Sequence, residues 1–179
     1  MKLTIRYVTR AMHRKAVAEW HSHHKPAVGE TLALGAFIGA ALVAVVVMGS
    51  PPACKLDDGS TWEVTRLAVG PDAPRFTASR LLGAAGRVMD EAGITLQVSY
   101  TRVDEKGGCY KAAGWIPVAY VDGRPHDTGN RALRWLPGLY EPSTDIINRV
   151  RWERGPRAPS TPPHVEWNGS LWTRCKAAA

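Results

Sequence analysis

Residues 61–93 contain a sharp change in the spacing of apolar side chains. Trp62–Val69 is rich in β-branched and apolar residues, which is typical of a half-buried strand, and Gly70-Pro71 ends it. Beyond this loop, apolar residues recur at helical spacing, with charged residues between them. The apolar positions are Leu81, Leu82, Ala85, Val88, Met89 and Ala92, and the charged ones are Arg80, Arg87, Asp90 and Glu91. With Thr77 as its cap and Gly93 at its end, this helix completes a predicted β-loop-α unit.

The junction of this loop and helix has the properties of an anion site. A helix N-terminus presents free backbone N–H groups and the positive end of the helix dipole, which suit a phosphate or pyrophosphate. Taken alone, the stretch fits an ordinary β-loop-α unit without a ligand better than a phosphate site.

The rest of the chain is predicted to form further strands and helices. Residues 1–7 alternate as a strand does, and Thr9 caps a helix. The inner stripe of that helix is Met12, Ala16, Val17 and Trp20, and its outer face carries Arg10, His13, Arg14 and Lys15. Further strands are expected at 94–100, 115–120 and 146–152, and a short helical turn at 109–113. The proline-rich segment from Gly155 onward is expected to be irregular.

The uncharged stretch Thr31–Gly49 has two interpretations. It includes Gly35 and Gly39 at the small-residue spacing of transmembrane helix pairs, so a single membrane span is one of them. Val43–Val47 is β-branched, however, and two glycines near the middle of the stretch suit a buried hairpin. We therefore expect two strands that turn near Gly39, and no membrane partner.

Charge and cysteine content narrow the class of partner and the compartment. The net charge is +7, and residues 1–30 hold six basic and two acidic residues while 121–179 hold nine and six. Basic ends suit a polyanion such as nucleic acid, although a solvated surface explains them equally well. The cysteines Cys54, Cys109 and Cys175 predict no disulfide framework, which favours a reducing compartment. No apolar signal-peptide region opens the chain, so a cytoplasmic location is expected.

Two segments resemble the GNAT superfamily of acyl-CoA-dependent N-acyltransferases. Glu63–Pro71, followed by Arg75 and a helix, is similar to the family's cofactor motif, and Tyr110–Trp115 matches its Tyr-x-x-x-Gly-aromatic signature. The resemblance implies an α/β fold with a mixed, mostly antiparallel central sheet flanked by helices. It also implies a GNAT-like acyltransferase domain at 1–154, followed by a C-terminal tail at 155–179.

The family resemblance implies acetyl-CoA as the acyl donor. In the family, the strand's backbone pairs with the pantetheine arm and the following loop holds the pyrophosphate. The matching positions here are Leu67, Ala68, Val69, Arg75, Thr77, Ala78, Ser79 and Arg80. A backbone N–H near Leu67 or Ala68 would also stabilise the oxyanion. The chain departs from the family at Phe76-Thr77-Ala78, where Gly-x-Gly is usual, so the glycines that permit close backbone approach are absent.

Direct transfer, without a covalent enzyme intermediate, is expected. Tyr110 stands at the family's general-acid position. Glu63 is the preferred base, because a carboxylate on this strand recurs in the family and partial burial can raise a carboxyl pKa toward neutrality. His23 and His24 are alternative bases, since imidazole titrates in a useful range. No metal is expected, because no partner pair follows these histidines at ligand spacing.

Within the superfamily, the strongest likeness is to small phage and prophage proteins. It is carried by Trp20–Pro26, Glu63–Leu67 and Lys111–Trp115. Those proteins are distantly similar to the phage Mom protein, which modifies adenine in DNA, and related phage enzymes are associated with acylating hypermodified thymine such as 5-aminomethyl-deoxyuridine. The likeness implies DNA as a partner and a nucleobase amine as the acetyl acceptor, in the cytoplasm of a bacterial host.

The expected contacts to that substrate lie in two basic segments. They are His21, His23 and Lys25 after the first helix, and Arg149 and Arg151 in a phosphate-tracking patch that continues to Arg154 and Arg157. Three alternatives stay open. They are modification of adenine with a larger group, acetylation of a protein or small-molecule amine, and a non-catalytic DNA-binding or inner-membrane protein built around residues 31–49.

Overall fold

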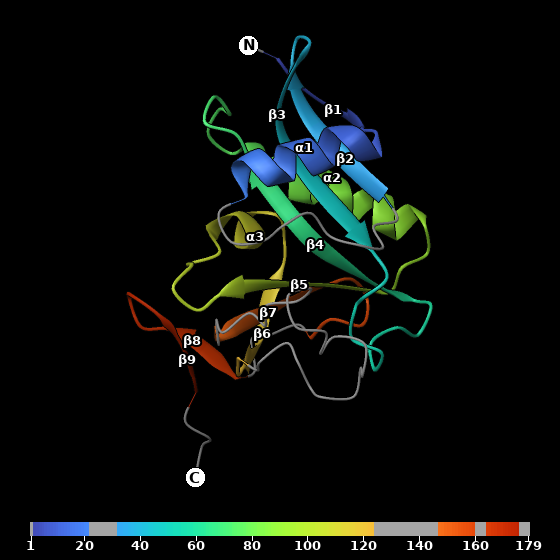
Figure 1. Ribbon diagram of the computed structural model, residues 1–179. Helices are drawn as coiled ribbons and strands as arrows, with labels where there is room; N and C mark the ends of the chain where they lie inside the picture. The colour runs from blue at the N-terminus through green and yellow to red at the C-terminus, as the bar shows by residue number, and fades with distance from the viewer. Residues whose placement is uncertain (1, 22–31, 124–146, 160–163, 176–179) are drawn as a thin grey trace, which may run out of the picture.

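The computed structural model describes residues 2–21, 32–123, 147–159 and 164–175. Its strands are β1 (Leu3–Tyr7), β2 (Leu32–Ile38), β3 (Ala41–Gly49), β4 (Thr61–Val69), β5 (Leu96–Arg102), β6 (Ile116–Val121), β7 (Arg149–Arg154), β8 (Val165–Trp167) and β9 (Trp172–Arg174). Its helices are α1 (Arg10–Trp20), α2 (Thr77–Glu91) and α3 (Gly108–Ala112) (Figure 1). The order predicted for the strands and helices up to residue 152 is confirmed.

Seven of the described strands form one mixed sheet. Its order is β1-β2-β3-β4-β5-β7-β6, and neighbouring strands are antiparallel except for β4 and β5. The predicted mixed, mostly antiparallel sheet is therefore confirmed. β4 pairs with β5 only over Thr61–Val64, opposite Leu96–Ser99, although both strands continue further. Beyond Val64 the two strands separate, and α3 lies at the opening between them (Figure 1).

β2 and β3 form the hairpin that the uncharged stretch predicts. It turns at Gly39, whose φ of +59° favours glycine. Val43–Val47 are buried, and their side chains contribute to the cores on both faces of the sheet. A Cβ at Gly35 would lie 2.5 Å from the Val8 side chain, so this glycine serves close packing beside β1. In the part of the chain that the structure describes, no helix is long and apolar enough to cross a membrane.

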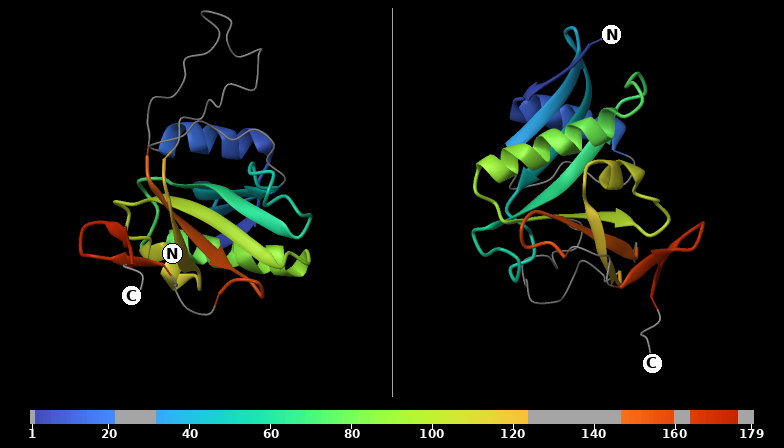
Figure 2. Two further views of the ribbon diagram at one scale, coloured as in Figure 1. Left: turned by 90° about the horizontal axis from the view of Figure 1, so that it is seen from below. Right: turned by 180° about the vertical axis from the view of Figure 1, so that it is seen from behind.

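Different helices cover the two faces of the sheet, as the left view of Figure 2 shows. The cluster under α1 comprises Ala16, Val17, Ala33, Val45, Val47 and Ala68. The larger core, under α2, includes Val46, Met48, Val64, Leu81, Leu82 and Met89. Side chains of β3 alternate between these two clusters, as expected of a strand buried on both faces.

The orientation of α1 differs from the prediction. Thr9 caps it as expected, and its Oγ1 accepts a hydrogen bond from the Met12 N–H at 3.3 Å. His13, predicted outside, is 4% exposed, whereas Met12, predicted inside, is 38% exposed. His13 precedes the buried pair Ala16 and Val17 by three and four residues, so it shares their face. The two predictions are wrong because this helix has few apolar residues. Their spacing is compatible with two buried faces that differ by one residue position, so the sequence pattern did not select between Met12 and His13.

The start of α2 also differs from the prediction. Phe76 occupies the N-cap position with a left-handed φ of +66°. Thr77 lies inside the helix and is buried, and its Oγ1 donates to the Pro74 carbonyl at 2.7 Å. The prediction that Thr77 caps the helix is wrong, because the chain turns one residue earlier. Gly93, with a φ of +77°, follows the end of α2 as predicted.

Residues 165–174 contain a hairpin in a segment predicted to be irregular. β8 and β9 pair antiparallel, and Val165 and Trp172 join the larger core. The Trp172 indole N–H donates to the Glu105 carbonyl at 3.0 Å. The prediction is wrong here because two tryptophans bury enough apolar surface to order a short hairpin despite the surrounding prolines. The division into a domain at 1–154 and a tail at 155–179 stays a prediction.

Candidate active site

A cavity of about 410 Å³ lies where β4 and β5 separate. Its walls come from the end of α1, from β4 and β5, from α3 and the loop that leads into it, and from the start of β7. The lining residues that carry chemistry include Glu63, Arg66, Leu67, Ser99, Tyr100, Tyr110 and Arg149. The two residues predicted to act as base and acid, Glu63 and Tyr110, therefore line the same space.

Helix α3 positions Tyr110 against aromatic neighbours. Gly107 has a φ of +69° at the start of this helix, and a Cβ there would lie 2.1 Å from the Trp152 ring. Glycine thus allows Tyr110 to stack on Trp152, with ring centroids 5.3 Å apart and an interplanar angle of 22°. Trp115 meets Tyr110 edge-on at 5.7 Å and is 2% exposed. These contacts fix the phenol ring, and they make Trp115 a core residue.

The phenol oxygen of Tyr110 belongs to a buried hydrogen-bond chain. It lies 2.9 Å from the Ser99 Oγ, and that Oγ donates to the Val64 carbonyl at 3.0 Å. Because a serine hydroxyl has one proton, the Tyr110 O–H is the donor to Ser99 in this arrangement. Burial raises the pKa of Tyr110 above its ordinary value, and the Ser99 hydroxyl opposes this effect because it can donate to the phenolate once Tyr110 is ionised. Tyr110 is therefore a protonated phenol at neutral pH, as a general acid must be.

The carboxyl of Glu63 has an unusual proton affinity. Burial raises its pKa to about 7, against the opposing positive charges of Arg66, Arg149 and Arg151. A carboxyl with this pKa is partly ionised at neutral pH and can both accept and release a proton there. The role of Glu63 as base stays a prediction.

A β-bulge in β4 directs Glu63. The pairs on either side of it are Val47 with Arg66 and Met48 with Val64, so Thr65 is an extra residue in β4. The extra residue resets the alternation of side chains, and Glu63 and Arg66 consequently share a face although they are three residues apart. Ala68 follows Arg66 by two residues and belongs to the cluster under α1, which identifies the shared face as the α1 side.

The backbone of β4 has a free edge beyond the point of separation. The Gly70 N–H donates to the Val43 carbonyl of β3 at 2.8 Å. Successive residues of a strand direct their backbone groups to opposite edges, so Ala68 faces β3 as Gly70 does. Leu67 and Val69 face the other edge, where β5 has moved away. Of the three residues predicted to pair with a cofactor, these two present backbone groups to the opening, and Ala68 does not.

The start of α2 has four candidate backbone amides for pyrophosphate binding, those of Thr77, Ala78, Ser79 and Arg80. Two of them are already hydrogen-bonded, because the Thr77 and Arg80 amides donate to the carbonyls of Pro74 and Phe76 at 3.2 and 3.0 Å. The candidate anion site therefore narrows to the amides of Ala78 and Ser79. The side chains of Arg75 and Arg80 are exposed beside them.

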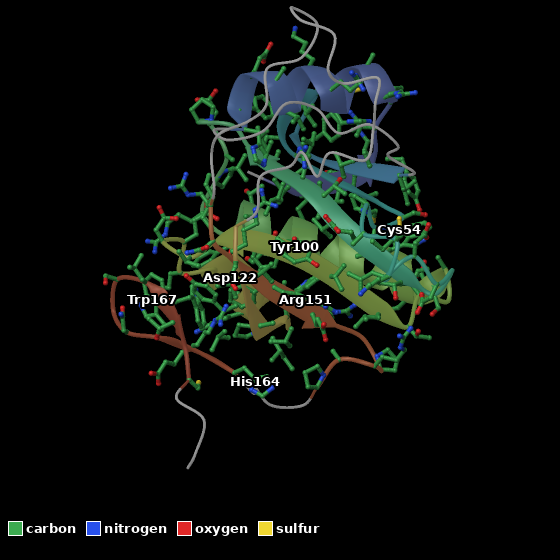
Figure 3. All side chains as sticks on the ribbon, turned by 60° about the horizontal axis from the view of Figure 1, so that its bottom comes forward. Cys54, Tyr100, Asp122, Arg151, His164 and Trp167 are labelled. Carbon is green, nitrogen blue, oxygen red and sulfur yellow. The ribbon has the colours of Figure 1, made fainter. Side chains whose placement is uncertain are left out.

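Arg149 and Arg151 share the face of the sheet that carries Glu63. They alternate with buried residues along β7, and Arg151 pairs in the sheet with Tyr100 of β5 (Figure 3). Arg151 also forms an ion pair with Glu153 on the same strand. Burial raises the pKa of the Tyr100 phenol, and the charges of both arginines and both glutamates act on it. One wall of the cavity is thus a half-buried polar surface with several cations.

The phosphate-tracking patch predicted at four arginines is divided between distant places. Arg154 lies on the α2 side of the sheet, where it bonds Asp90 at 2.7 Å. Arg157 pairs with Asp58 at 2.8 Å. The prediction is wrong for these two residues, because strand alternation sends Arg154 to the opposite face and Arg157 lies beyond the end of β7.

The predicted histidine contacts are described only in part. His21, at the C-cap of α1, lines the cavity. The remaining residues of that segment, His23, His24 and Lys25, lie outside the described residues. Among the residues that are described, no group of three or more His, Cys, Asp or Glu side chains is placed to hold a metal ion.

Ser99, Tyr100 and Arg66 also line the cavity, and the sequence predicts them only as members of strands. A signal for Ser99 does exist, because it is a hydroxyl at a buried position of a largely apolar strand. Its partners could not be predicted, since Val64 and Tyr110 lie on other elements.

A model of the Mom protein family matches residues 2–128. This chain belongs to the Mom protein family. The matched region of this Mom-family protein includes Glu63, Ser99 and Tyr110, and the predicted likeness to Mom is confirmed. No curated protein matches the chain.

Solved structures share the fold of this Mom-family protein at low identity. The protein yncA from Salmonella typhimurium, with its cofactor acetyl-CoA, has a TM-score of 0.61 and 14% identity, covering 91% of this chain and 99% of that one. A Bacillus subtilis acetyltransferase in complex with CoA has a TM-score of 0.54 and 14% identity, with 85% and 97% covered. A GNAT-family acetyltransferase from Streptococcus pneumoniae has a TM-score of 0.56 and 13% identity, covering 86% of this chain and 98% of that one. The predicted GNAT fold is confirmed.

Proposed function

We propose that this Mom-family protein is an N-acetyltransferase that moves the acetyl group of acetyl-CoA directly to an amine of a DNA nucleobase. One observation carries the proposal. A carboxyl with a pKa of about 7 and a buried, protonated phenol line the same cavity, at the point where two strands of a GNAT fold separate. This pair supplies the base and the acid that acyl transfer from a thioester to an amine requires.

The residues near the cavity fit an acyl-CoA donor. Acetyl-CoA supplies the acyl group as a reactive thioester. The backbone groups of Leu67 and Val69 at the free edge of β4 can pair with the amides of the pantetheine arm, as strand addition does. The pyrophosphate contacts would be Arg75, Ala78, Ser79 and Arg80. Phe76 stands where the family has glycine, yet it has the left-handed φ that glycine favours, so the turn into α2 is retained.

Each group has a defined task in the proposed reaction. Glu63 accepts a proton from the attacking amine, which must be neutral to be a nucleophile. The Leu67 amide, which faces the open edge, donates to the developing oxyanion. Tyr110 gives its proton to the leaving thiolate.

Two features support a nucleobase in DNA as the acceptor. Membership of the Mom family is the first, because the likeness to phage DNA-modifying proteins implies a base in DNA as the acceptor. The second is the pair of arginines in the cavity lining, Arg66 and Arg149, because arginines beside a cavity suit the phosphates that flank an extruded base. An aminomethyl group on hypermodified thymine is the acceptor that best uses Glu63, because an alkyl amine is protonated at neutral pH and needs a base. Family membership favours adenine as the second candidate acceptor.

Nucleoside analysis tests the proposal. The purified protein is incubated with labelled acetyl-CoA in three separate reactions. The acceptor is DNA that contains aminomethyl-uracil in the first, unmodified DNA in the second and a protein mixture in the third. Digestion and mass analysis are expected to find the acetyl group on a nucleoside, and the modified base separates the two candidate acceptors. Glu63→Gln and Tyr110→Phe are the matched controls, since each keeps the shape of the side chain and removes the proton-transfer group. Label only on protein would contradict the proposed acceptor.

A further inference from the structure

Ser99 lies between the Tyr110 phenol and the point at which β4 and β5 separate. Its Oγ donates to the Val64 carbonyl at 3.0 Å, and Val64 is the last residue of β4 that pairs with β5. The same Oγ is 2.9 Å from the Tyr110 Oη. Ser99 is 1% exposed, so these hydrogen bonds form in a largely desolvated position.

The single proton of the Ser99 hydroxyl has two acceptors within reach. When it points to the Val64 carbonyl, Tyr110 donates its own proton to Ser99. When it points to the Tyr110 oxygen, Tyr110 no longer donates a hydrogen bond to Ser99, and the Tyr110 O–H can point into the cavity. Rotation of the Ser99 hydroxyl about its Cβ–Oγ bond is enough to exchange these two arrangements, because both acceptors lie at hydrogen-bond distance.

We infer that Ser99 is a positioning residue for the acid step, which rests on the acid role proposed for Tyr110. As the Tyr110 O–H bond breaks and an S–H bond forms on the leaving thiolate, the Ser99 O–H turns from Val64 to the Tyr110 oxygen. No covalent bond of Ser99 changes, and the phenolate later recovers a proton from water. A charge-assisted hydrogen bond from Ser99 offsets the cost of a phenolate in a buried site, a cost that burial otherwise makes high.

A double-mutant cycle tests this role. Ser99→Ala is expected to lower kcat by about 10- to 100-fold, the value of a hydrogen bond to a charged group, with little change in the KM for acetyl-CoA. Ser99→Thr keeps the hydroxyl and restores most of the rate. In a Tyr110→Phe background, Ser99→Ala has no further effect, because the group through which Ser99 acts is gone. An equal loss in both backgrounds would indicate a purely structural residue and overturn the inference.

An NMR experiment on the full chain tests the hydrogen bond between Tyr110 and Ser99 in the absence of any acetyl acceptor. The Tyr110 hydroxyl proton, assigned by its absence in Tyr110→Phe, is expected to exchange slowly in the wild type and in Ser99→Thr and to exchange rapidly in Ser99→Ala. Unchanged exchange in Ser99→Ala overturns the inference. If the hydrogen bond is present but neither the wild type nor any variant transfers acetyl to any acceptor, the proposed function and the acid step both fail. That outcome differs from a failure of Ser99 alone, in which the wild type is active and Ser99→Ala is equally active.

Discussion

Glu63 and Tyr110 experience the same physical effect with different chemical results. Burial raises the pKa of both groups, because it disfavours the charged form of each acid. Glu63 starts from 4.5 and reaches about 7, so it exchanges protons at neutral pH. Tyr110 starts from 10.0 and moves further upward, so it stays a protonated phenol at neutral pH and is available there as a proton donor. Two acids in one cavity thereby acquire separate tasks.

The pKa shift of Glu63 makes stability depend on pH. Its folded-state pKa of about 7 exceeds the ordinary 4.5, so the folded state binds more protons between these values and stability falls as pH rises through them. Glu63→Gln mimics the protonated form. We expect this variant to melt at a higher temperature than the wild type near pH 8 and at nearly the same temperature near pH 4. Equal melting temperatures at both pH values, measured by calorimetry, would show that the carboxyl is not desolvated.

Gly107 is predicted to be indispensable for the placement of Tyr110. Gly107→Ala forces a left-handed φ on alanine and brings a Cβ into the Trp152 ring, so we expect a loss of at least about 2 kcal/mol in unfolding free energy. Gly108→Ala is the matched control, because a Cβ there meets nothing within 4 Å. Urea denaturation of both variants measures the difference, and similar midpoints would contradict this description of α3.

Strands and helices were largely predictable, whereas the features that shape the site were not. The hairpin of β2 and β3 and the helical turn before Trp115 follow from local spacing and from glycines. The bulge at Thr65 arises from how β4 pairs with β3, and the separation of β4 from β5 arises from where their pairing stops. Both are consequences of long-range pairing, which a local pattern does not record. The wrong cap at Thr77 has a local origin instead, since the Thr77 hydroxyl bonds the Pro74 carbonyl three residues earlier and does not cap the helix.

The hairpin of β8 and β9 is expected to contribute strongly to stability. Trp172 is 3% exposed, meets Trp152 edge-on at 5.5 Å and donates to Glu105, so Trp172→Ala should cost about 3–5 kcal/mol of unfolding free energy. Leu171→Ala provides the comparison. Leu171 is next to Trp172 but is 43% exposed, so this substitution should cost less than about 0.5 kcal/mol of unfolding free energy. If thermal melting shows equal effects for both variants, the hairpin does not pack on the core as described.

Considered as a whole, the molecule has its candidate donor contacts and its candidate acceptor contacts on different walls of one opening. The free edge of β4 and the start of α2 face the proposed donor, and the wall with Glu63 and Arg149 faces the proposed acceptor. The sequence indicated Glu63 and Tyr110 through a family likeness, and it indicated Arg149 and Arg151 through strand alternation. The prediction groups Arg154 with them because the expected strand ends at Trp152, whereas β7 continues to Arg154 and its alternation turns that side chain to the other face.

The proposed DNA contact predicts a specific salt dependence. The logarithm of the DNA affinity should fall linearly with the logarithm of salt concentration, and Arg149→Ala should reduce the slope by about 1 if this arginine contacts a phosphate. Arg157→Ala serves as the control, because Arg157 is paired with Asp58 away from the cavity. Fluorescence anisotropy with short DNA measures both slopes. An equal change in the two variants would indicate that net charge, rather than the cavity wall, governs binding.

The pH dependence of acetyl transfer tests the central assignment most directly. For the wild type, kcat/KM should rise with pH and level off above an apparent pKa near 7, because the free protein must carry an ionised Glu63. Glu63→Gln should lose this limb and about 10²- to 10⁴-fold in rate. A wild-type profile that is flat through neutral pH, or a limb that survives in Glu63→Gln, would contradict the assignment of Glu63 as the base.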